Sequence, residues 1–87
     1  SEVPIELSHD EYERVSKWSF GAIIELTATR DFNRDPAWIA ARLGVSEPEV
    51  RSAIEDLLRL GLLKETPEGL KKTGKWVVSR ERGRTSE

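Results

Sequence analysis

The sequence predicts a mainly α-helical domain that ends in a small β-hairpin, the arrangement known as a winged helix-turn-helix. Residues 39–50 carry the strongest signal. Ala40 is small enough for two helices to cross closely, and Gly44 tolerates the positive φ of a tight turn between them. Gly61 then closes the second helix, and two strand-like runs separated by a Pro-Glu-Gly turn follow it. An ordinary helical hairpin beside a β-hairpin is the alternative interpretation.

Length and composition limit the chain to one folded domain. It has 87 residues, of which 37% are hydrophobic and 34% charged, and these values are typical of a globular chain. It has no Cys, and neither a signal peptide nor an apolar run of about 18 residues is present. We therefore expect a cytoplasmic protein without a membrane partner. Because residues 2–7 begin within a strand-like pattern, we also expect the natural termini to lie outside this sequence.

The first element is a short edge strand, because apolar residues alternate along residues 3–7 and a proline there lacks an amide hydrogen. Ser8 and Glu11 then form a capping box, which predicts a helix over residues 8–29. The predicted inward stripe of this helix consists of Tyr12, Val15, Ser19, Ala22, Ile23 and Leu26. Gly21 within the helix predicts a close approach of another backbone.

Two shorter helices follow. Asp35 and Pro36 start the first of them as its N-cap and first helical residue, and Gly44 ends it in the left-handed conformation. Ser46, with a glutamate three residues later, caps the next helix, which runs to Gly61. The predicted inner face of that helix consists of Val50, Ala53, Ile54, Leu57 and Leu58.

A β-hairpin completes the predicted domain, which we assign to residues 1–79. Residues 62–66 and 70–73 read as its strands. Residues 75–79 either extend this sheet or pack beside it, and Trp76 is expected to cover the core, with stacking on a nucleic-acid base as the alternative. Residues 80–87 contain no apolar side chain, which predicts a flexible basic tail.

Charge is distributed unevenly along the chain. Residues 1–60 contain 7 Lys/Arg and 12 Asp/Glu, a net charge of −5, whereas residues 61–87 contain 7 Lys/Arg and 4 Asp/Glu, a net charge of +3. An acidic body with a basic end says more about partners than the net charge of −2 does.

The helix over residues 46–61 is a poor match for the phosphates of DNA. Its predicted outer face carries Glu47, Arg51, Ser52, Glu55, Asp56 and Arg59, and with Glu49 its charges sum to −2. Arg51 and Ser52, near the start of the helix, are the candidate base contacts. A solvated face with the ion pairs Glu47–Arg51 and Glu55–Arg59 is an equally supported interpretation.

The basic residues lie instead on the hairpin and after it: Lys64, Lys71, Lys72, Lys75, Arg80, Arg82 and Arg84. A lysine-rich hairpin can lie along phosphates or enter a minor groove. Alternatively, its lysines protect an exposed strand edge from pairing with another chain. Our candidate DNA-binding residues are Arg51, Ser52, Lys64, Lys71, Lys72 and Lys75.

No set of residues indicates catalysis or a cofactor. His9 is the single His, and no further ligands stand at the spacing that a metal site needs. No glycine-rich phosphate loop and no nucleophile–base pair appears in the sequence. We therefore expect neither enzyme activity nor a cofactor or metal.

Several segments also resemble a known family. They are Ser16-Lys17-Trp18, Ile24-Glu25-Leu26, Asp31-Phe32, residues 35–40, Arg42-Leu43-Gly44-Val45 and residues 57–63. Together they resemble a bacterial family of unknown function whose members carry a winged helix within a longer chain. The resemblance covers about residues 3–74, and from Lys75 onward the sequence departs from it. It implies a cytoplasmic bacterial protein of a kind described as transcriptional regulators, and it implies no catalytic or binding residues.

These observations leave two hypotheses. In the first, the chain is the DNA-binding module of a bacterial transcriptional regulator and contacts DNA largely through the hairpin. In the second, the same fold serves protein–protein interaction or homodimerisation, with the acidic helix over residues 46–61 as the docking face.

Overall fold

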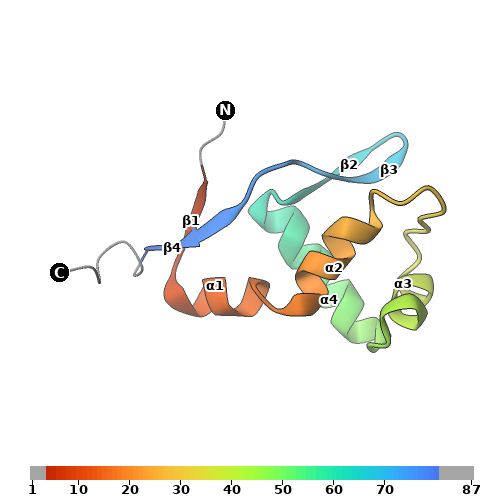
Figure 1. Cartoon of the computed structure of the whole chain (residues 1–87), viewed down its shortest axis with the longest axis horizontal. Coiled ribbons are helices and arrows are strands. Elements are labelled where there is room, and N and C mark those ends of the chain that lie inside the picture. Colours follow the sequence, from red (N-terminus) through yellow and green to blue (C-terminus); the bar gives the residue numbers. More distant parts are fainter. Residues whose placement is uncertain (1–3, 81–87) are drawn as a thin grey trace.

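Four helices and four short strands make up residues 4–80, the part of the chain that the computed structural model describes (Figure 1). In chain order they are β1 (Ile5–Leu7), α1 (His9–Val15), α2 (Trp18–Leu26), α3 (Pro36–Leu43), α4 (Glu47–Leu60), β2 (Leu63–Thr66), β3 (Gly69–Lys72) and β4 (Val77–Ser79). The prediction of a mainly helical chain with a small β-hairpin is confirmed at this level.

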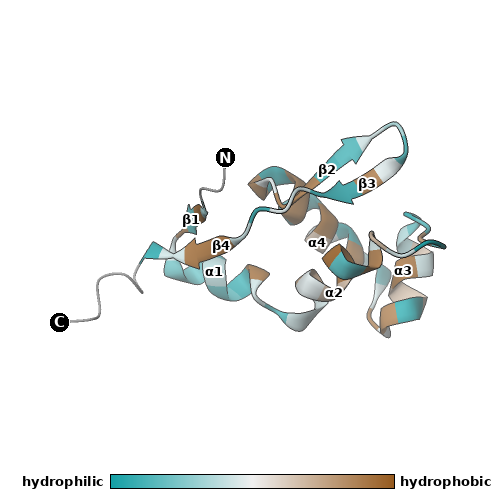
Figure 2. Ribbon diagram, turned by 45° about the horizontal axis from the view of Figure 1, so that its top comes forward, coloured by the Kyte–Doolittle hydropathy of each residue, from teal (hydrophilic) through white to brown (hydrophobic). Residues whose placement is uncertain are grey.

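The core forms where α4 packs against the other helices. Ile23 of α2, Ile39 of α3 and Leu57 of α4 are each fully buried. α4 also contacts α1 and β2, so one helix touches most of the fold. Much of the projecting hairpin is hydrophilic (Figure 2).

The helix predicted over residues 8–29 is wrong, because the chain breaks it into α1 and α2. Ser16 ends α1, and its hydroxyl donates to the carbonyl oxygen of Glu13 at 3.1 Å. Lys17 then adopts an extended ψ of 149° before α2 begins. A serine hydroxyl that bonds to a nearby carbonyl competes with helix propagation. The predicted stripe survives the break, since Val15, Ser19 and Ile23 are buried, and Phe20 joins it while Trp18 is 64% exposed.

The expected backbone contact at Gly21 is also wrong. Gly21 is exposed, and a Cβ placed on it would meet no atom within 4 Å. Within the described residues, no other backbone therefore packs closely against this glycine.

The predicted caps of α3 and α4 are confirmed. A carboxylate oxygen of Asp35 accepts from the amide of Ala37 at 3.1 Å, and the hydroxyl of Ser46 accepts from the amide of Glu49 at 3.2 Å. Gly44 turns the chain between the two helices with a φ of 75°. Each of these features depends on residues close in sequence, which explains why the sequence predicts them.

The strands form two separate sheets. β2 and β3 pair antiparallel across the two-residue loop Pro67-Glu68, which confirms the predicted hairpin. β4 does not extend it, because it pairs in parallel with β1 on another side of the helices. Trp76, expected over the core, is 45% exposed. The predicted basic tail lies outside the described residues except for Arg80, which donates to the carbonyl oxygen of Glu6 at 3.4 Å.

Two glycine substitutions should have opposite effects on stability. Gly44→Val should lower the free energy of unfolding by about 1 kcal/mol or more, because a β-branched residue is strained at a φ of 75°. Gly21→Ala should raise it by about 0.5–1 kcal/mol, because alanine favours an exposed helical position. Urea unfolding of the two variants and the parent chain checks both signs. A stable Gly44→Val variant would show that the turn tolerates another conformation.

Candidate functional site

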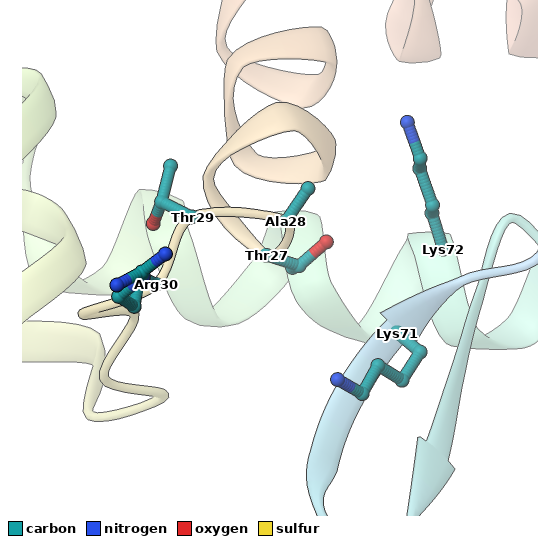
Figure 3. A pocket seen from close by; sticks show the side chains of 6 residues that line it. All are labelled: Thr27, Ala28, Thr29, Arg30, Lys71 and Lys72. Carbon is teal, nitrogen blue, oxygen red and sulfur yellow. The ribbon is translucent and has the colours of Figure 1, made fainter.

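A basic groove lies between the end of α2 and strand β3 (Figure 3). Its volume is about 590 Å³, and it is lined by Thr27, Ala28, Thr29, Arg30, Lys71 and Lys72. The lining contains three cations and no carboxylate. In Figure 3 Arg30 lies on one side of the groove and the two lysines on the other, with Lys71 extending toward the side of Arg30 and Lys72 pointing upward, not toward it.

The end of α2 shapes one wall of this groove. The hydroxyls of Thr27 and Thr29 donate to the carbonyl oxygens of Ile24 and Leu26 at 2.6 and 2.7 Å. These bonds hold the last turn in place and position Arg30 directly after it. The C-terminal end of a helix carries partial negative charge, which favours cations beside it. That stabilising effect is an alternative reason for a positive charge at this position.

An ion pair fixes the hairpin next to the loop that precedes α3. The guanidinium of Arg34 donates to both carboxylate oxygens of Glu65 in β2, at 2.8 and 2.9 Å. The bonded guanidinium lowers the pKa of Glu65 below its ordinary value, and the carboxylate raises the pKa of Arg34. Because the two bonds are parallel, they restrict both the distance and the relative orientation of the Arg34 and Glu65 side chains.

A second, smaller groove lies between α4 and the start of α3. Its volume is about 280 Å³, and it is lined by Arg34, Pro36, Arg51, Ile54 and Glu55. The predicted pair Glu47–Arg51 is present, with 3.5 Å between the charged atoms. The predicted pair Glu55–Arg59 is wrong.

Arg59 instead contacts Asp56 and Glu11, each at 3.1 Å. The reason is packing: α1 lies against α4 and brings Glu11 within reach of Arg59. The two arginines on the outer face of α4 are therefore both paired with carboxylates.

The candidate residues do not form one continuous site. Lys71 and Lys72 line the basic groove, and Lys64 lies opposite Lys71 in the hairpin register. Arg51 lines the α4 groove, and Ser52 is exposed on the same helix. Lys75 follows β3 and is exposed.

Sequence reasoning missed Arg30. Its position in a loop indicated no partner, and only the packing of α2 beside β3 brings it to the two lysines. Arg30 also lies within residues 1–60, whose net charge is −5, so the charge distribution along the chain did not mark it as part of a basic surface.

Two kinds of feature are absent from residues 4–80, the described part of the chain. Within that range, no group of three or more His, Cys, Asp or Glu side chains gathers as metal ligands would. Over the same range, every helix is too short or too polar to cross a lipid bilayer.

Comparison with known proteins gives one finding. A family model described as "Domain of unknown function (DUF4423)" matches residues 2–87. The expected resemblance to a family of unknown function is confirmed to that extent. The match continues to residue 87, so the expectation that the sequence departs from its family at Lys75 is wrong. No curated protein and no solved structure matches the chain.

The pKa of the Glu65 carboxyl should lie below that of an ordinary glutamate in the folded chain, because Arg34 donates to both of its oxygens. The ion pair then stabilises the fold above the unfolded pKa, and this contribution disappears as the pH falls through the folded value. NMR titration of the carboxyl carbon checks the direction of the shift.

Arg34→Gln should return this pKa to its ordinary value. Arg42→Gln is the matched control, since Arg42 faces Asp31 instead, at 3.5 Å. An unchanged Glu65 pKa in Arg34→Gln would contradict the assignment.

Proposed function

The chain belongs to this DUF4423 family, and from that premise we propose that it is a winged helix-turn-helix module of a bacterial transcriptional regulator that binds duplex DNA. In this proposal α3 and α4 form the helix-turn-helix, and the β2–β3 hairpin is the wing. The order of elements supports it: two capped helices joined at Gly44, then Gly61 and an antiparallel hairpin. The wing and the groove beside it contact the phosphates.

The observation that carries the proposal is the basic groove without a carboxylate. Arg30 and the pair Lys71 and Lys72 line this groove from two elements that are distant in sequence. Lys and Arg side chains that neutralise phosphates release condensed counterions, which drives association with DNA. A surface of this composition suits a polyanion better than a basic or apolar partner.

The distribution of ion pairs supports the same surface. Arg34, Arg51 and Arg59 each contact a carboxylate. No ion pair involves the three groove cations within residues 4–80. A phosphate that approaches the groove therefore has no carboxylate to displace. By contrast, one that approaches α4 must compete with Glu47 for Arg51.

Removing the groove charges should weaken DNA binding. We expect Lys71→Gln/Lys72→Gln and Arg30→Gln each to lower affinity for a mixed-sequence duplex. The slope of log affinity against log salt should become shallower by about 1 for each lost contact. Fluorescence anisotropy titrations at low and moderate salt measure both quantities.

Lys17→Gln is the matched control, because Lys17 is exposed at the start of α2 and outside the groove. It should bind as the parent chain does. Unchanged affinity in both groove variants would make the lysines a solvated strand edge. Absence of duplex binding by the parent chain at low salt would end the DNA proposal.

The outer face of α4 favours a second candidate function, docking of another protein. Its arginines are internally paired, so Glu49 and Glu55 remain as surplus negative charge at an exposed surface. A basic patch on a partner, or the basic hairpin of a second copy, complements this face. Sedimentation equilibrium tests the homodimer: a strict monomer at high concentration contradicts self-association, whereas a dimer that Glu55→Lys dissociates supports it.

A further inference from the structure

Two lysines face each other directly across the hairpin. The β2–β3 register pairs Lys64 with Lys71, and both residues are exposed. Opposed residues of an antiparallel pair project to the same face of the sheet, with their Cβ atoms about 4.5–5.5 Å apart. The next pair on that face is Thr66 and Gly69. This face of the strands therefore carries two neighbouring cations and no carboxylate.

Like charges in directly opposed positions destabilise a sheet. Within residues 4–80, neither lysine takes part in an ion pair. The carboxylate nearest in the register, Glu65, belongs to the other face, opposite Leu70, and is bonded to Arg34. The isolated chain therefore retains a repulsion that an anion between the two amines would relieve.

We propose that Lys64 and Lys71 together bind one backbone phosphate of duplex DNA. The inference rests on the proposed DNA binding and names a second point of attachment for it. Lys71 connects this pair to the groove, because it also lines the groove with Arg30 and Lys72. Lys72 lies on the opposite face of the hairpin, next to Leu63 in the register. That face also carries the buried Leu63 and Leu70, so the pair of opposed lysines is the one that lies on the outward face of the hairpin.

The proposal requires stability and binding to change in opposite directions. Lys64→Glu places a carboxylate opposite Lys71, so the melting temperature should rise by about 2–4 °C. The same variant should bind a mixed-sequence duplex more weakly, with a salt slope shallower by about 1. Lys64→Gln should also weaken DNA binding, but its melting temperature should rise less, because glutamine removes the repulsion without adding a carboxylate that attracts Lys71. Lys17→Gln, the control outside the hairpin, should leave affinity unchanged.

The outcomes separate this inference from the function on which it rests. If the parent chain binds duplex DNA and Lys64→Glu binds equally well, the lysine pair holds no phosphate and the groove alone accounts for binding. If the melting temperature of Lys64→Glu stays constant or falls, the two amines do not repel each other in the free chain, and the inference is likewise overturned. If the parent chain itself fails to bind at low salt, the proposed function and this inference fail together.

Discussion

Burial of the apolar face of α4 is the interaction on which the rest of this structure depends. Val50 and Leu57 are fully buried, and the helix contacts α1, α2, α3 and β2. Its end also positions the hairpin. Gly61 turns the chain with a φ of 84°, and the hydroxyl of Thr73 donates back to the carbonyl oxygen of Gly61 at 2.7 Å. The place of the hairpin is therefore determined by where α4 stops.

This arrangement explains the separation of charge. Arginines near helix contacts are engaged with neighbouring elements: Arg59 links α4 to α1, and Arg42 lies over the ring of Trp38 at 4.3 Å while facing Asp31. The lysines of the hairpin lie on a projecting element (Figure 1), and the carboxylate of Glu65 in β2 is bonded to Arg34 and not to a lysine. Exposed ion pairs contribute little to stability, about 0–1 kcal/mol each. Their main consequence here is that the paired arginines are less available to a partner than the hairpin lysines, which form no ion pair within residues 4–80.

The sequence predicts those parts of the fold that depend on local chemistry. Asp35, Gly44 and Ser46 act as caps or turns through bonds to residues at most four positions away. The hairpin follows from a Pro-Glu-Gly turn between two short runs with strand-like alternation. The same local reasoning failed at Ser16. The capping box and the apolar stripe favour one continuous helix, and the local sign of the break in the structure is the bond from the Ser16 hydroxyl to the carbonyl oxygen of Glu13.

The parts that the sequence could not predict depend on tertiary packing. The parallel pairing of β1 with β4 joins segments about 70 residues apart, and nothing in either segment specifies its partner. Arg34 and Glu65 are 31 positions apart, and an arginine in a loop could pair with many carboxylates. For the same reason, two of the three groove cations were foreseen: Lys71 and Lys72 stood out by composition, whereas Arg30 gains its place only from the packing of α2 beside β3.

The electrostatics of α4 also restrict how DNA could approach. If α4 lay flat in a major groove, Glu49 and Glu55 would come close to phosphates with no cation to neutralise them. Repulsion between exposed charges is screened over about 10 Å at 0.1 M salt, so a separation of that order removes most of the repulsion between the helix and the backbone. The projecting hairpin offers it, since its lysines can reach phosphates while the acidic face is tilted away. A chain that uses this geometry would have affinity for the backbone and little means of reading bases, because Arg51 is held away from the duplex together with the acidic face of α4.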